Sequence, residues 1–205
     1  MKKLFTKDKI LSFLHNMADL MILNVLTVIC SIPIITIGVS YTAMHYVLTR
    51  WDEDKKIIRD FFIAWKNNFL QATIIWLIHL VVFGFLAYDF FLFKEQLLGA
   101  NSTFKLVMTV VTVVVILAST WTFILQSRYQ NTILQIIKNS LILGFVQVKQ
   151  TFLIALLYIL PILIAVLFPQ IIPMVFLLGV ATAGYFQRKL YRKVFEKLEN
   201  KNEDS

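Results

Sequence analysis

The sequence predicts an all-α integral membrane protein, a polytopic bundle of about six membrane-embedded helices, and two observations predict it. Hydrophobic residues make up 59% of the 205 residues and charged residues only 16%, whereas soluble domains carry about 25% charged residues. The charges are also separated by long apolar intervals, each able to cross a hydrocarbon core of ~30 Å at about 1.5 Å per residue. Such a chain has too few polar side chains to cover a water-exposed globule, so we expect one transmembrane domain over 1–205.

The first apolar run extends from Leu20 to Thr49 without a charged residue. As one helix it would be about 45 Å long, which is too long for a single crossing and short for two. Pro33 and Gly38 interrupt this run, so we expect the chain to turn back between them. Because lipid cannot hydrogen-bond the carbonyls freed at such a turn, the turn is expected in the interior of the bundle.

The remaining elements follow from the intervals between charges and from the helical spacing of apolar residues. No charge lies between Lys149 and Arg188, and the three prolines in this interval predict a hairpin of two helices that turns at 168–170. The expected elements are an amphipathic N-terminal helix over 4–16, membrane-embedded helices over 18–32, 38–49, 69–93, 104–127, 150–168 and 171–187, cytoplasmic amphipathic helices over 54–67 and 130–145, and a basic cytoplasmic tail over 188–205.

Lysine and arginine gather on one side of the predicted membrane. They precede the first span, follow the second and the sixth, and separate the fourth from the fifth, whereas Lys94 and Lys105 alone fall on the other side. The positive-inside rule therefore predicts a multi-pass protein of the plasma membrane with both termini in the cytoplasm. The same asymmetry explains the net charge of +8, so we expect anionic membrane lipids, and not nucleic acid, to contact these bases.

The connection after the second span predicts an amphipathic helix. Its apolar residues recur at helical spacing, and charged residues cover the opposite face. This apolar face either rests on the membrane surface or docks onto the cytoplasmic face of a partner protein. Its residues are Ile57, Ile58, Phe61, Phe62, Trp65 and Phe69.

Small and polar side chains form stripes on the predicted spans. A stripe of this kind at membrane depth faces other helices or a wet cavity. Two interpretations stay open, namely hydrogen bonds that fix helix packing and a cavity that binds or conducts a solute. The residues are Asn24, Thr27 and Ser31 on the first helix, Pro33 at the turn, Gly38, Tyr41, Thr42 and His45 on the second helix, His79 on the third, and Thr112, Ser119 and Gln126 on the fourth.

The sequence gives no indication of an enzyme. It contains no HExxH, GxSxG, GxxxxGK[ST] or CxxC motif and no pair of carboxylates within a span. His15, His45 and His79 lie on separate segments without carboxylates at ligand spacing, so neither a metal site nor a cofactor is expected. The single cysteine, Cys30, excludes an intrachain disulfide.

Two stretches carry a resemblance to a known family. The first is ADLMILNVLTVICSIPIITIGVSYTAMHYVLTR, and the second is IIRDFFIAWKNNFLQATIIWLI. An asparagine in the first helix, a Pro-Ile-Ile-Thr-Ile-Gly turn and a Phe-Phe, Trp-Lys, Asn-Phe, Gln-Ala-Thr pattern resemble the bacterial YesL-like family, known as domain of unknown function 624, most strongly over Met17 to Ile78. In that family a proline often follows the glycine of the turn. Val39 stands there in this chain, so the turn is expected to be less rigid.

The resemblance implies a genetic association and no catalytic residue, because the family has no established biochemical activity. Its genes often accompany those of carbohydrate-uptake ABC transporter permeases and polysaccharide-degrading enzymes in Gram-positive bacteria, which is an association and not a mechanism. The first hypothesis is therefore an accessory or regulatory partner of a carbohydrate ABC transporter, which binds its permease subunits. The alternative is a small-solute transporter or channel in its own right, which uses the polar stripes around the Pro33–Gly38 break.

Overall fold

The computed structural model describes residues 2–53, 56–96 and 102–203. Because these residues form helices and turns with no strand among them, the predicted all-α class is confirmed. The helices are α1 (Lys2–Cys30), α2 (Ile37–Thr49), α3 (Ile57–Gln96), α4 (Ser102–Arg128), α5 (Ile133–Val146), α6 (Val148–Leu167), α7 (Ile172–Met174) and α8 (Val180–Glu203), with 3-10 turns η1 (Ile34–Thr36) and η2 (Pro169–Ile171) and a π-helical turn η3 (Val175–Gly179).

Five stretches of the described chain are long and apolar enough to cross a membrane, which confirms the membrane class. The helix α2 has 13 residues and is one of two shorter apolar helices, as predicted for the second membrane-embedded element. The five long stretches are Asp8–Cys30, Ile57–Asp89, Leu106–Arg128, Val148–Leu167 and Pro169–Glu199.

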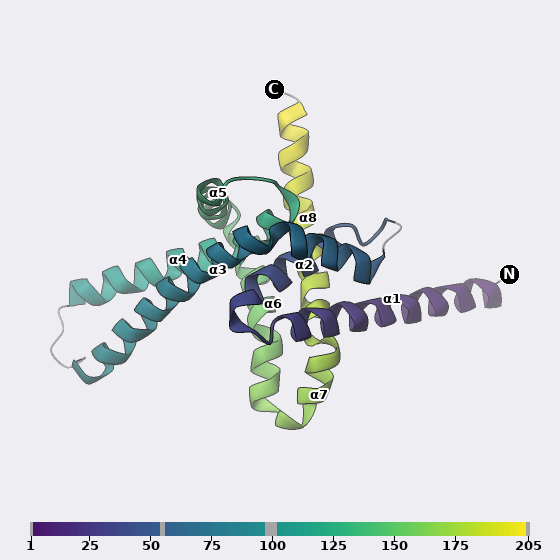
Figure 1. Ribbon diagram of the computed structural model, residues 1–205, viewed down its shortest axis with the longest axis horizontal. Helices are drawn as coiled ribbons and strands as arrows, with labels where there is room; N and C mark the ends of the chain where they lie inside the picture. The colour runs from purple at the N-terminus through teal and green to yellow at the C-terminus, as the bar shows by residue number, and fades with distance from the viewer. Residues whose placement is uncertain (1, 54–55, 97–101, 204–205) are drawn as a thin grey trace.

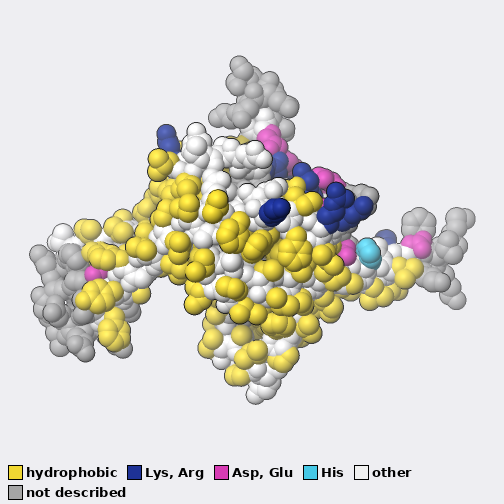
Figure 2. All heavy atoms as spheres, viewed as in Figure 1, with side chains coloured by type: hydrophobic (Ala, Val, Ile, Leu, Met, Phe, Trp, Pro, Cys, Tyr) yellow, Lys and Arg dark blue, Asp and Glu magenta, His cyan; other side chains and the backbone are white. Residues whose placement is uncertain are grey.

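The surface along these stretches is apolar. Large side chains such as Leu70 and Val81 are 76% and 73% exposed, which a soluble protein does not sustain over so large an area. Figure 2 shows hydrophobic side chains over the lower part of the molecule, whereas most lysine and arginine side chains lie towards the upper end. The spans therefore contact membrane lipid. The cytoplasmic location of the basic end remains a prediction. The side chains of Lys94 and Lys105 are not among those that the structure describes.

The short helix α2 lies at the centre of the molecule. It packs against α1, α3, α4 and α8, and nine of its 13 residues are buried. The other helices extend away from it, with the α3–α4 pair on one side, α1 on the other and the hairpin of α6 and α7 below (Figure 1). The turn after Pro33 therefore leads the chain into the interior, where the sequence predicted the returning helix.

Two hydrophobic clusters each join four helices. The first joins α1, α2, α3 and α8 and includes Leu23, Met44 and Phe61. The second joins α4, α5, α6 and α8 and includes Trp121 and Phe195. Both clusters contain residues of α8, so this helix links them.

The helices are longer and more continuous than the sequence pattern predicted. A single helix, α1, covers the expected segments 4–16 and 18–32 as far as Cys30, and α3 likewise covers 54–67 and 69–93 from Ile57 onward. No glycine or proline stands where the expected segments meet, near residues 17 and 68, so a change from a charged to an apolar surface does not end the helix. Residues 54 and 55 lie outside the described residues.

The expected tail over 188–205 also belongs to a helix. Helix α8 continues to Glu203, and residues 204 and 205 lie outside the described residues. Tyr191 and Phe195 are 1% exposed in the second hydrophobic cluster. Burial of these aromatic rings stabilises a helical stretch that the basic composition alone does not reveal.

Candidate functional site

The turn between α1 and α2 frees backbone carbonyls, and side chains of this protein bond to them. Thr36 Oγ1 donates to the carbonyl of Cys30 at 2.6 Å and to that of Pro33 at 2.8 Å. From α3, the indole N–H of Trp76 donates to the carbonyl of Ile34 at 2.6 Å. Non-helical backbone at membrane depth requires such partners, and Trp76 was not singled out by the sequence pattern.

Gly38 permits the closest approach of α2 to its neighbours. A Cβ atom built at this position would lie 2.6 Å from Trp76 Cβ, 2.8 Å from Phe123 Cε1 and 2.9 Å from the carbonyl oxygen of Ala72. Side chains do not approach so closely. The absence of a side chain at Gly38 is therefore a packing requirement.

Asn24 connects α1 to the irregular turn η3. Its Nδ2 donates to the carbonyl of Phe176 at 2.5 Å, and its Oδ1 accepts from the backbone N–H of Ala181 at 2.7 Å. The side chain is fully buried. A π-helical turn shifts the regular hydrogen-bond register and leaves backbone groups to be paired from outside the helix. Asn24 pairs one donor and one acceptor of this backbone.

His45 connects α2 to α6 within a group of aromatic rings. Its Nε2 lies 2.9 Å from the hydroxyl of Tyr158, whereas its Nδ1 is buried without a hydrogen-bond partner among the described residues. The rings of Tyr158 and Tyr191 lie edge-on to the imidazole, at centroid distances of 6.2 Å and 5.8 Å. The ring of Tyr41 is tilted against that of Tyr158, at a centroid distance of 5.9 Å. The histidine is thus enclosed by aromatic side chains.

The other predicted stripe residues bond mainly within their own helices. His79 Nδ1 lies 2.7 Å from the carbonyl of Ile75, one turn earlier. The hydroxyl groups donate in the same way to the carbonyl four residues before them, as Thr27, Ser31, Thr42, Thr112 and Ser119 do. Such bonds satisfy the hydroxyl without a partner helix. The stripes therefore do not converge on one polar site: that of α1 reaches η3, that of α2 reaches α6, and that of α4 reaches α3.

The predicted amphipathic face at the start of α3 is divided between the core and the surface. Ile57 and Phe61 are 7% and 0% exposed in the first hydrophobic cluster, and Trp65 packs against that cluster. Ile58 and Phe62 are 55% and 46% exposed. Ile57, Phe61 and Trp65 thus stabilise the fold, and only Ile58 and Phe62 of this face are exposed to a partner or to lipid. Phe69, the last residue of this face, is half-buried.

A polar cavity of about 820 Å³ opens between the end of α2, the start of α3 and the segment from the end of α4 to the start of α5. We call it the amide cavity. Tyr46 and Arg50 contribute from α2, and Arg128 and Tyr129 contribute from the end of α4. Its amide side chains are Asn67, Asn68, Gln71, Gln126, Gln130, Asn131 and Gln135.

A chain of hydrogen bonds fixes one wall of the amide cavity. Gln126 Nε2 donates to Asn68 Oδ1 and to Gln71 Oε1, at 3.1 Å in each case. Gln71 Nε2 in turn donates to the carbonyl of Asn131. The remaining acceptor, Gln126 Oε1, is buried without a partner among the described residues. Gln126, a lining residue of the cavity, thus keeps one buried acceptor unpaired among the described residues.

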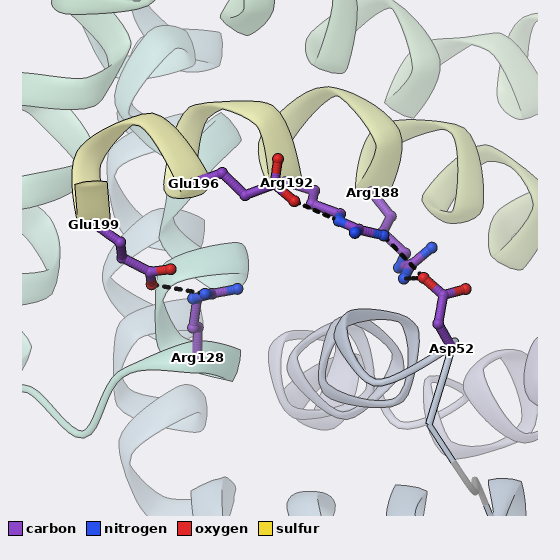
Figure 3. Close-up of polar contacts among 6 residues, drawn as sticks. All are labelled: Asp52, Arg128, Arg188, Arg192, Glu196 and Glu199. Carbon is purple, nitrogen blue, oxygen red and sulfur yellow. Dashed lines mark hydrogen bonds and ion pairs between the residues drawn. The ribbon is translucent and has the colours of Figure 1, made fainter. Parts of the chain in front are cut away.

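A second cavity, of about 330 Å³, lies beside the amide cavity and shares Arg128 with it. We call it the arginine cavity. Figure 3 shows its ion pairs: Arg188 and Arg192 of α8 both reach Asp52, and Arg128 of α4 reaches Glu199 at 2.7 Å. The guanidinium of Arg192 lies 2.9 Å from Asp52. These pairs hold α8 against the end of α2 and the end of α4.

The carboxylate of Asp52 is stabilised by the arginines that it accepts from. Its hydrogen bond with Arg188 holds the pKa of Asp52 below its usual range, and the charges of Arg188 and Arg192 act in the same direction against a raising effect of burial. Because the pKa is lower in the folded chain than in the unfolded chain, the ionised pair stabilises the fold at neutral pH. This contribution is lost as the pH falls below about 4.

We expect the Asp52→Asn variant to be less stable than the wild type at neutral pH by about 1 kcal/mol, a small value because the Asp52 side chain is 62% exposed. The difference should shrink at acidic pH, as the pH falls through the lowered pKa of the folded-state Asp52 carboxyl and protonation removes its charge. Thermal unfolding in detergent at both pH values measures it. Glu53→Gln is the control, since Glu53 lines the same cavity but makes no ion pair among the described residues. A deficit that persists unchanged at acidic pH would contradict the expectation.

The amide cavity and the arginine cavity were not predicted as sites. Their residues come from five helices, α2, α3, α4, α5 and α8, and from the connections between them, and many of them are far apart in the sequence. The available signal was the amides Asn67, Asn68 and Gln71, which stand together where the charge-free part of α3 begins. Within the described residues, no group of three or more His, Cys, Asp or Glu side chains is arranged to hold a metal ion.

Residues 20–90 match the sequence pattern of the family described as "Protein of unknown function, DUF624". The match covers α2, most of α3 and the part of α1 that contains Asn24. It confirms the resemblance identified over Met17 to Ile78. No curated protein and no solved structure matches the chain.

Proposed function

We propose, from the premise that residues 20–90 carry the DUF624 pattern, that this membrane protein is an accessory or regulatory partner of a carbohydrate ABC transporter. The transporter class comes from the gene association that the family resemblance implies. The observation that supports a docking role is the exposure of Ile58 and Phe62 on the apolar face at the start of α3. The proposal therefore concerns a protein partner and assigns no catalytic residue.

The start of α3 extends beyond the membrane on a rigid helix. Helix α3 has 40 residues and is about 60 Å long, twice the hydrocarbon core of ~30 Å. Its charge-free part begins after Lys66, so the turns that carry Ile58 and Phe62 lie at the membrane surface or outside it. Their exposure there, while Phe61 is buried, leaves a narrow apolar ridge. Such a ridge at i and i+4 fits the mode in which a helix docks into an apolar groove of a partner.

A transporter or channel function has less support from the geometry. The hydroxyl groups of the predicted stripes donate to carbonyls of their own helices, and Asn24 bonds to the backbone of η3 and α8. Neither Asn24 nor His45 lines the amide cavity or the arginine cavity. These contacts favour the packing interpretation of the stripes.

Affinity purification from native membranes in a mild detergent tests the proposal. We expect the tagged chain to recover the permease subunits of a carbohydrate ABC transporter. A photo-crosslinking amino acid at Ile58 or at Phe62 should form a covalent adduct with a permease subunit. The control position is Leu134 on α5, which is 80% exposed and lies outside the ridge.

The double variant Ile58→Ser, Phe62→Ser should lose the permease, and Leu134→Ser should retain it. Both sets of side chains are exposed, so little change in stability is expected. Recovery of the permease by the ridge variant at the wild-type level would refute docking through α3. Repeated purification without any permease subunit would refute the proposed partner.

A further inference from the structure

We infer that the amide cavity binds the headgroup of an anionic phospholipid whose phosphodiester carries free hydroxyl groups, of which phosphatidylglycerol is the simplest example. The shared chemistry is a phosphate ester of a polyol, which a soluble compound could also supply. Three properties of the cavity support this ligand, namely its charge, its buried acceptor and its place in the fold.

The charge of the cavity suits a singly charged anion. Arg50 and Arg128 line it, and no carboxylate is among its described lining residues. Glu199 compensates Arg128 at 2.7 Å. Arg50 lies over the ring of Tyr46, with Cζ 4.6 Å from the ring centroid, and makes no ion pair among the described residues. The lining therefore has about one uncompensated positive charge, which matches a phosphodiester better than a doubly charged phosphomonoester.

The buried acceptor of the cavity requires a donor. Gln126 is 3% exposed, and both of its Nε2 hydrogen bonds are made to Asn68 and Gln71. Its Oε1 has no partner among the described residues, and leaving a buried acceptor unpaired costs free energy. A hydroxyl group of a ligand that reaches the buried Oε1 supplies the missing donor. A phosphate oxygen cannot, because it is itself an acceptor.

The place of the cavity favours a lipid over a soluble ester. Its walls include Asn67 and Asn68, which stand immediately after Lys66, where the charge-free part of α3 begins. That position corresponds to the headgroup region of a bilayer. Tyr46 and Tyr129 line the same cavity, and tyrosine is enriched at this depth. An arginine near the surface attracts anionic headgroups.

The volume of the cavity accommodates a headgroup. About 820 Å³ lies within the range of pockets that hold small molecules, roughly 300–1,000 Å³. The amide side chains offer both donors and acceptors, so they are able to contact phosphate oxygens and hydroxyl groups together. A fixed hydrogen-bonded wall reduces the ordering that binding requires.

A series of short-chain lipids tests the inference on the full, delipidated chain. Dioctanoyl phosphatidylglycerol has the charge and the hydroxyl groups, dioctanoyl phosphatidylmethanol has the charge alone, and dioctanoyl phosphatidylcholine is zwitterionic. Native mass spectrometry counts the bound lipids, and the shift in thermal unfolding gives the affinities. We expect phosphatidylglycerol to bind roughly fivefold tighter than phosphatidylmethanol, and phosphatidylmethanol roughly fivefold tighter than phosphatidylcholine.

Variants assign these preferences to the cavity. Arg50→Gln should remove the preference for an anionic lipid, whereas Arg59→Gln, an exposed arginine of α3 outside the cavity, should keep it. Gln126→Leu should equalise phosphatidylglycerol and phosphatidylmethanol while an anionic preference remains. If Gln126→Leu fails to fold, the comparison of the three lipids on the wild type and on Arg50→Gln still shows whether the cavity recognises the charge and the hydroxyl groups of the lipid.

Several results would overturn the inference. Equal affinity for phosphatidylglycerol and phosphatidylcholine excludes headgroup recognition. If Arg50→Gln and Arg59→Gln lose the preference for an anionic lipid to the same extent, the general surface charge attracts the lipid. Equal affinity for phosphatidylglycerol and phosphatidylmethanol excludes hydroxyl recognition by Gln126. Binding of the soluble phosphodiester glycerophosphoglycerol without any preference among the lipids assigns the cavity to a soluble ester. None of these outcomes depends on the transporter partner proposed above.

Discussion

Replacement of Asn24 by leucine is expected to lower the stability of the folded protein by about 2–3 kcal/mol. The two side chains have the same number of heavy atoms and the same branching, so the main loss is the pair of hydrogen bonds to the carbonyl of Phe176 and to the N–H of Ala181. Both backbone groups belong to the segment around η3 and would remain unpaired in an apolar environment. Thermal unfolding of the purified protein in detergent measures the loss.

Thr27→Val is the matched control for this variant. Thr27 lies on the same helix and is equally buried, at 1% exposure, but its hydroxyl donates only to Leu23 of its own helix. We expect a change within about 0.5 kcal/mol, because the hydroxyl and its acceptor lie in one helix. Hydrogen exchange adds a local readout, since the amide of Ala181 should exchange faster in Asn24→Leu alone. Equal losses of stability in both variants would show that the connection from Asn24 to η3 is not what stabilises this region.

Replacement of Gly38 by alanine is expected to destabilise the protein by about 1–3 kcal/mol, as overpacking of a close helix contact does. The new Cβ would meet Trp76 Cβ at 2.6 Å and the carbonyl oxygen of Ala72 at 2.9 Å. Both atoms are at or next to the backbone of α3, so no side-chain rotation relieves the clash. Helix α2 must move away from α3, and thermal unfolding in detergent measures the cost.

Gly84→Ala provides the control in the same protein. No atom lies within 4 Å of a Cβ atom built at Gly84, in the lipid-facing part of α3. Alanine favours the helix over glycine by about 0.5–1 kcal/mol, so this variant should be as stable as the wild type or more stable. A stable Gly38→Ala protein, or a loss of equal size in Gly84→Ala, would contradict the importance of the close approach.

The Gly38→Ala variant also tests how far the cavities depend on the position of α2. Tyr46 and Arg50, which line the amide cavity, follow Gly38 on α2 and at its end. Asp52, which accepts from Arg188 and Arg192, stands in the loop that follows. A helix displaced at its start shifts these groups, so we expect Gly38→Ala to weaken phosphatidylglycerol binding as well as stability.

Much of the architecture followed from local composition. The charge-free intervals predicted the spans because a hydrocarbon core excludes charge, and the interruption at Pro33 and Gly38 predicted the short internal helix because lipid offers no hydrogen bonds. The breaks expected near 17 and 68 are absent from α1 and α3. The polarity of the sequence changes at those points, but no residue there stops a helix. Composition alone does not distinguish a change of polarity from the end of a helix.

The partners of the polar side chains could not be predicted in the same way. Asn24, His45 and Gln126 were each recognised as polar residues at membrane depth, but their partners Phe176, Tyr158 and Asn68 lie 152, 113 and 58 residues away. Helical periodicity assigns a residue to a face and not to a neighbour. The paired residues become adjacent only when the helices assemble.

The sequence by itself therefore determined that this chain is a helical membrane protein with a broken, buried second helix, because each of those features depends on the solvent preference of a short segment. Only the tertiary structure decided that the polar stripes separate, that half of the apolar face of α3 becomes core, and that amides from distant helix ends enclose a cavity beside Arg50 and Arg128. Those outcomes depend on distances between segments, which are set by how the helices pack against one another.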